Sequence, residues 1–134
     1  MEIKYNEATP QRPDGDRSLD AALVSIDLPA FVKQIKEEST WKESDRNAIT
    51  VFKTNGLRIV LIALHKGAEM ATHTAEGIIS VQVLEGQMQF NTEWRSVELS
   101  KGQMLALHER IPHNVLALEE TIFLLTLTTS LKAK

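Results

Sequence analysis

Residues 27–39 show the clearest helical pattern of apolar and polar positions. Apolar side chains recur at helical spacing, at Leu28, Phe31, Val32 and Ile35. Charged and polar residues fill the opposite face. Asp27 stands where its carboxylate can accept hydrogen bonds from the first free backbone N–H groups of a helix. The pattern predicts one amphipathic helix that begins at Asp27, ends near Ser39, and lies on the outside or across an open end of the molecule.

From residue 48 onward the pattern changes to short runs rich in Val, Ile, Leu, Phe and Thr, separated by turn residues. The runs are 48–53, 57–65, 78–85, 87–91, 96–99, 103–107, 114–118 and 121–128. Asn55-Gly56, between the first two runs, is a tight hairpin signal. A series of short strands that follows one helix predicts an all-β sandwich or barrel and argues against a parallel α/β sheet.

The residues before the helix lack such a pattern. Residues 1–18 contain Pro10, Pro13 and Gly15 together with several charges, and they cannot bury enough apolar surface to offset the entropy of ordering. We therefore predict a flexible arm over 1–18 and a single barrel domain over 19–134. The short apolar patch 21–26 predicts an extra strand at a sheet edge. An apolar edge is better covered than exposed, which favours a homodimer.

Composition narrows the functional classes. The chain has 134 residues, the length of one domain, and 15 Lys and Arg against 18 Asp and Glu, which gives no basic excess for nucleic acid. The absence of cysteine excludes disulfides, thiolate metal ligands and a cysteine nucleophile, and suits a reducing cytoplasm. The longest wholly apolar run, 59–64, is far shorter than the ~20 residues of a membrane span. We expect a cytoplasmic protein with neither membrane nor nucleic acid as a partner.

Histidine is the residue type here best suited to bind a metal or to move a proton near neutral pH. Of the four histidines, His73 lies six residues after Gly67, and His113 lies eleven residues after Gly102. The sequence Leu84-Glu85-Gly86 follows His73 at the end of a predicted strand. These spacings resemble the two motifs of the cupin superfamily. In that resemblance, which covers about residues 48–128, the two histidines fall on conserved histidine positions.

The resemblance implies a double-stranded β-helix, the jelly-roll barrel of cupins, and it also supports a homodimer. It further implies a metal held by three His and one Glu inside the barrel. Here the second His position is Ala75 and the Glu position is Ile79. His73 and His113 alone supply too few bonds to hold a divalent ion tightly. Glu76 is the candidate substitute ligand, so we assign no cofactor and keep a weakly bound divalent metal as the alternative.

Strand alternation places residues 79, 81 and 83 on the inward face. The predicted ligand pocket therefore comprises His73, Ala75, Ile79, Val81, Val83 and His113. The favoured function is a small-molecule binding or sensing domain with an apolar barrel cavity and a degraded metal site. Two alternatives stay open: a metal-dependent enzyme, such as a small oxygenase or isomerase, that uses the two histidines and a substitute ligand, and a structural role with a filled pocket.

The remaining candidate residues have simpler interpretations. We expect His65 to be a partly exposed strand residue and His108 a turn residue. Trp41 and Trp94 could stack against a ligand, but a tryptophan in a small domain more often packs in the core.

Overall fold

The computed structural model describes residues 4–6 and 17–129, which form eleven strands and two helices. The strands are β1 (Lys4–Asn6), β2 (Arg17–Asp20), β3 (Arg46–Lys53), β4 (Leu57–Leu64), β5 (Glu69–His73), β6 (Ile79–Glu85), β7 (Gln87–Thr92), β8 (Ser96–Ser100), β9 (Met104–Leu107), β10 (His113–Ala117) and β11 (Thr121–Thr128). The helices are α1 (Leu28–Glu37) and α2 (Ser39–Glu43). Neither described helix is long and apolar enough to span a membrane.

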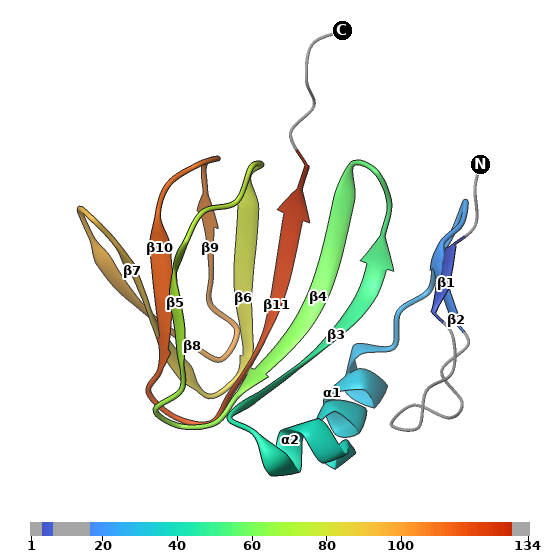
Figure 1. The fold of residues 1–134 in the computed structure, drawn as a ribbon, viewed down its shortest axis with the longest axis horizontal. Helices are drawn as coiled ribbons and strands as arrows, with labels where there is room; N and C mark the ends of the chain where they lie inside the picture. Colours follow the sequence, from blue (N-terminus) through green and yellow to red (C-terminus); the bar gives the residue numbers. More distant parts are fainter. Residues whose placement is uncertain (1–3, 7–16, 130–134) are drawn as a thin grey trace, which may run out of the picture.

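Two antiparallel sheets make up the barrel (Figure 1). One has five strands in the order β3-β4-β11-β6-β9, and the other has four in the order β5-β10-β7-β8. All eight strands predicted beyond residue 48 are present, most of them within one or two residues of the expected ends. The prediction of an all-β jelly-roll barrel is confirmed.

The core lies between the two sheets, and β4 also has a second buried face. Ile62 and Leu64 pack into the space between the sheets against residues such as Phe123. Leu61 and Ala63, which alternate with them, pack against the helices and are fully buried. Residues 61–64 are buried on both faces and residues 59 and 60 partly so, which explains why residues 59–64 are an unbroken apolar run.

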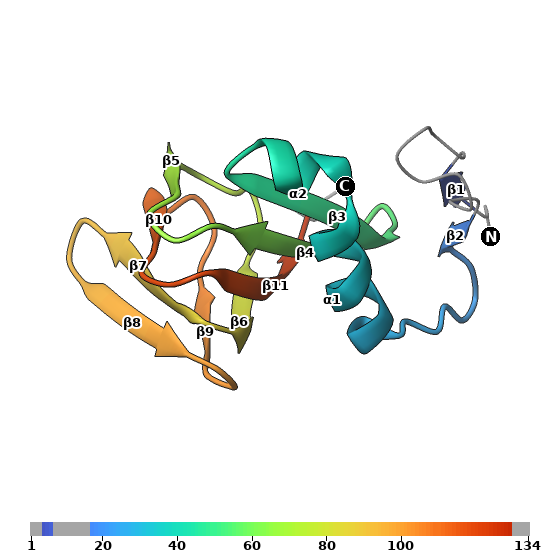
Figure 2. The same ribbon diagram turned by 90° about the horizontal axis from the view of Figure 1, so that it is seen from below.

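The predicted amphipathic helix is α1, and it packs on the outer face of the five-stranded sheet, on the side away from β7 and β8 (Figure 2). The backbone N–H of Ala30 donates to Asp27 Oδ1 at 3.1 Å, as the capping prediction requires. The prediction of a single helix is incomplete, because α2 follows after a break at Glu38. The Glu38 carboxylate accepts hydrogen bonds from Asn47 and Gln34, which holds the chain at this break.

The predicted strand at 21–26 is wrong. This segment has no regular structure, and the side chain of Leu23 is 88% exposed. The strand in this part of the chain is β2, which pairs with β1. The apolar strand edge at 21–26, on which the homodimer prediction partly depended, is therefore absent. The homodimer itself stays a prediction. The flexible arm and the division at residue 18 also stay predictions, since residues 1–3 and 7–16 lie outside the described ones.

The strand β5 was not predicted, although it carries one of the two key histidines. Its side chains are mostly exposed, so it has no apolar alternation to detect. Its position comes from pairing with β10. The adjoining turn is held by two backbone hydrogen bonds, from Gly67 N to Ala117 O at 2.8 Å and from Ala117 N to Ala68 O at 3.0 Å.

Candidate functional site

His73 and His113 lie side by side on neighbouring strands. His73 is the last residue of β5, His113 is the first residue of β10, and the two are register partners. Their ring centroids are 4.3 Å apart, with 60° between the ring planes. The prediction that two separate motifs deliver these histidines to one place is confirmed.

Backbone carbonyls fix the protonation pattern of both rings. Nδ1 of His73 lies 2.7 Å from Ala71 O, and Nδ1 of His113 lies 2.9 Å from Ile111 O. Because a carbonyl oxygen only accepts hydrogen bonds, Nδ1 is the protonated nitrogen in each ring. The Nε2 atom of each neutral ring is therefore left as an acceptor.

The two rings differ in their surroundings. His73 is exposed, whereas His113 is 4% exposed and stacks on Phe90, with ring centroids 5.1 Å apart and 13° between the planes. Burial lowers the pKa of His113, since it disfavours the charged imidazolium; the hydrogen bond to Ile111 O partly opposes this, and the nearby His73 adds to it. His113 is therefore neutral at pH 7.

The histidine pair opens into a pocket of about 570 Å³, a size typical of small-molecule sites. The pocket is lined by His73, Thr74, Ala75, Glu76, Ile79, His113, Leu125, Leu127, Thr128 and Thr129. Ala75 and Ile79 thus lie where the sequence placed them, beside the two histidines. Val81 and Val83 do not line the pocket; they are buried deeper, in the core between the sheets.

Five lining residues were missed: Thr74, Leu125, Leu127, Thr128 and Thr129. A signal existed for two of them. Leu125 and Leu127 alternate along the last predicted strand, and in β11 they pair with Val81 and Ile79. Alternation along that strand would have suggested its inward face, but only the sheet order shows that β11 lies next to β6.

The described residues do not fit the four-ligand metal site that the resemblance implies. Ala75 and Ile79 occupy two of the ligand positions and have no donor atoms. Glu76 lines the same pocket, yet within residues 4–6 and 17–129 no three His, Asp or Glu side chains come together as a metal-binding group. The polar groups that line the pocket are the two imidazoles, the Glu76 carboxylate and three threonines.

His65 and His108 lie away from this pocket. His65 follows β4, and its side chain is 38% exposed. Its ring stacks on buried Trp41 at a centroid distance of 3.5 Å, and its Nε2 lies 2.9 Å from Trp41 O. His108 precedes a turn, and its side chain is 80% exposed. Trp41 is a core residue, whereas Trp94 is 73% exposed and lines a separate pocket.

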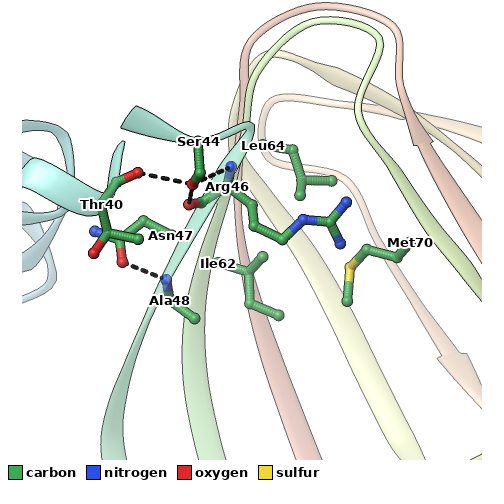
Figure 3. A pocket seen from close by; sticks show the side chains of 8 residues that line it. All are labelled: Thr40, Ser44, Arg46, Asn47, Ala48, Ile62, Leu64 and Met70. Carbon is green, nitrogen blue, oxygen red and sulfur yellow. Dashed lines mark hydrogen bonds between the residues drawn. The ribbon is translucent and has the colours of Figure 1, made fainter. Parts of the chain in front are cut away.

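A smaller pocket of about 260 Å³ lies between β3 and β5, and Figure 3 shows the Arg46 side chain extending across it toward Met70. The Arg46 guanidinium already donates to Glu69 O at 2.6 Å and to the Asp45 carboxylate. Because this cation has its partners, the pocket is a weaker ligand candidate than the one at the histidine pair.

No protein-family model and no curated protein matches the sequence. Solved structures do match. A cupin-2 domain protein from Shewanella frigidimarina is 15% identical over 77% of this chain and 93% of its own, with a TM-score of 0.62. A conserved protein of unknown function from Streptococcus pyogenes is 24% identical over 85% and 92%, with a TM-score of 0.63.

A variant of salicylate 1,2-dioxygenase from Pseudoaminobacter salicylatoxidans is 18% identical, with a TM-score of 0.68. The match covers 81% of this chain but only 37% of the dioxygenase. At these identities the likeness concerns the architecture of the barrel. The topology, the spacing of the two histidine segments and these neighbours agree: the chain has the cupin fold.

Proposed function

We propose that this protein binds a small organic molecule in the pocket at His73 and His113. The observation that carries the proposal is the pair of adjacent imidazoles, each with Nδ1 on a backbone carbonyl and Nε2 left to accept. Two acceptors at one point favour a ligand with a proton-donating group there, such as a hydroxyl.

The walls of the pocket favour an apolar ligand body. Ile79, Leu125 and Leu127 present aliphatic side chains beside the histidines. A ligand that covers these apolar walls removes their surface from water, which contributes to its affinity. The few polar groups of the pocket set the ligand's orientation. The lowered pKa of His113 supports the same ligand, because a neutral ring accepts a hydrogen bond where an imidazolium would donate one.

Cyclohexanol and methoxycyclohexane are suitable probes, because both have an aliphatic ring and an oxygen but only the alcohol has a proton to donate. In calorimetric or NMR titrations at pH 7.5 we expect cyclohexanol to bind saturably and the ether to bind at least about fivefold more weakly, the cost of one lost hydrogen bond in a buried site. Equal binding of the two compounds would contradict the role assigned to the imidazoles.

Substitutions at the two histidines test whether cyclohexanol binds in this pocket. His73→Phe and His113→Phe keep a ring of similar size without the acceptor, and each should weaken cyclohexanol binding. His108→Phe, at an exposed position outside the pocket, is the matched control and should bind as the parent does. Elemental analysis of the purified protein tests the competing metal-enzyme hypothesis: one tightly held ion per chain would favour that hypothesis over the proposal.

A further inference from the structure

We propose that the barrel has a second ligand site, selective for small aromatic anions, in the pocket between the β7–β8 turn and β9. This pocket has a volume of about 450 Å³. Its walls include Phe90 from β7, Trp94 and Arg95 from the turn, Met104 from β9, and Ile111. The strands β8 and β9 belong to different sheets, so the pocket opens at a seam of the barrel.

The apolar surface of this pocket is unusually exposed. The side chains of Trp94 and Met104 are 73% and 56% exposed, and they are two of the four large apolar residues that are exposed in the described part of the chain. An indole beside a flexible thioether offers a flat, polarisable surface on which a planar ring can stack. The surface therefore favours an aromatic ligand over an aliphatic one.

The charge at the rim selects an anion. Arg95 is the only charged residue that lines the pocket, and within residues 4–6 and 17–129 its guanidinium has neither a hydrogen bond nor an ion pair. The turn fixes its backbone, because Thr92 N donates to Arg95 O at 2.8 Å and Arg95 N donates to Thr92 Oγ1 at 3.2 Å. A guanidinium at the rim of an apolar pocket matches a carboxylate, to which it can donate two parallel hydrogen bonds.

The second site is distinct from the first. Phe90 lines the second pocket, His113 lines the first, and the stacked pair of these two rings separates the pockets. The first pocket has aliphatic walls and two acceptor nitrogens, whereas the second has an indole and a cation. The two pockets therefore prefer different ligands, and each can be tested with the other disabled.

Naphthalene-2-carboxylate and its uncharged carboxamide test the proposal. The chain has only two tryptophans, so the two indole N–H signals in a ¹H–¹⁵N spectrum can be assigned with Trp94→Phe. We expect the carboxylate to shift the Trp94 signal saturably and to leave the signal of buried Trp41 unchanged. The carboxamide should bind at least about fivefold more weakly, since the guanidinium forms a bidentate ion pair with the carboxylate and only a hydrogen bond with the neutral amide.

Arg95→Gln should reduce the affinity for the carboxylate to that for the carboxamide. Arg58→Gln removes the same charge from β4, outside the pocket, and should leave the affinity unchanged. His113→Phe should weaken cyclohexanol binding and retain naphthalene-2-carboxylate binding, so failure of one site is distinguishable from failure of the other. The proposal is overturned if acid and amide bind equally, if Arg95→Gln binds as the parent does, or if the Trp94 signal depends on self-association and not on the ligand.

Discussion

His73 and His113 face each other across two paired strands, with their ring centroids 4.3 Å apart. His113 has three contacts that fix its ring: Phe90 stacks on one face, His73 packs against it with 60° between the ring planes, and Ile111 O accepts from Nδ1. A ring fixed in this way holds Nε2 in one direction, and His113 lines the pocket. The proposed acceptor role of the pair rests on this fixed orientation of the His113 ring.

Restoring the two missing ligand types should convert the pocket into a metal site. Ala75→His with Ile79→Glu places an imidazole and a carboxylate beside His73 and His113, all four positions lining the one pocket. Without metal the variant should be about 1–3 kcal/mol less stable than the parent, because polar groups enter a nearly buried site. Zn²⁺, Ni²⁺ or Mn²⁺ should restore about 2.7 kcal/mol at a hundredfold excess over the dissociation constant.

Thermal unfolding with and without metal, together with metal content, measures this outcome. The matched control is Ala75→His with Ser80→Glu, which adds the same groups but puts the carboxylate on the opposite face of β6. A folded Ala75→His, Ile79→Glu variant that responds to metal no better than this control would show that the pocket geometry is misassigned.

The buried state of His113 should make stability depend on pH. Burial lowers its pKa in the folded protein below the ordinary value of 6.5. As pH falls through 6.5, the unfolded chain takes up a proton that the folded protein does not, so the free energy of unfolding decreases until pH falls below the folded-state pKa. Urea unfolding between pH 8 and pH 5 should show this loss in the parent. The loss should be smaller in His113→Gln and unchanged in His108→Gln, whose ring is exposed.

Gly86 should be the glycine least tolerant of substitution among the three that have a positive φ in the described part of the chain. Its φ is +88°, and a Cβ there would lie 2.1 Å from Glu120 O and 2.8 Å from the Cα of Thr121. Gly102 has nearly the same φ, +87°, but no atom within 4 Å of an added Cβ. Gly102→Ala should therefore cost about 1 kcal/mol of backbone strain, and Gly86→Ala about 3 kcal/mol or more. Denaturant unfolding of the two variants compares them, and equal costs would show that β11 does not approach the turn this closely.

The sequence predicts those strands whose buried positions can be recognised from the pattern of apolar residues. The apolar runs within 59–64 and 121–128 and the alternation in 78–85 locate three central strands, because their inward positions are apolar. The strand β5 escapes prediction since its side chains are mostly exposed and only its pairing with β10 makes it a strand. The patch 21–26 is the converse case, apolar in sequence but unpaired in the structure.

The candidate site likewise contains residues that the sequence places correctly and residues that it does not. Motif spacing brings His73, Ala75, Ile79 and His113 together correctly. Alternation assigns Val81 and Val83 to the inward face, but it does not show how deep the pocket is. At the level of these two residues, side chains from the opposite sheet fill the interior of the barrel. Exposure of Trp94 cannot be derived from its neighbours in sequence, because it depends on where the β7–β8 turn lies relative to β9.

The ¹⁵N spectrum of histidine-labelled protein at pH 7.5, recorded with and without cyclohexanol, measures whether the His73–His113 pair accepts a hydrogen bond from a ligand. We predict that both rings carry a proton at Nδ1, that His113 is neutral, and that cyclohexanol shifts the Nε2 resonances of the pair saturably and at lower concentration than methoxycyclohexane does. His108, exposed and outside the pocket, serves as the internal control. Protonation at Nε2 in either ring, or an alcohol response no larger than that of His108, would contradict the account.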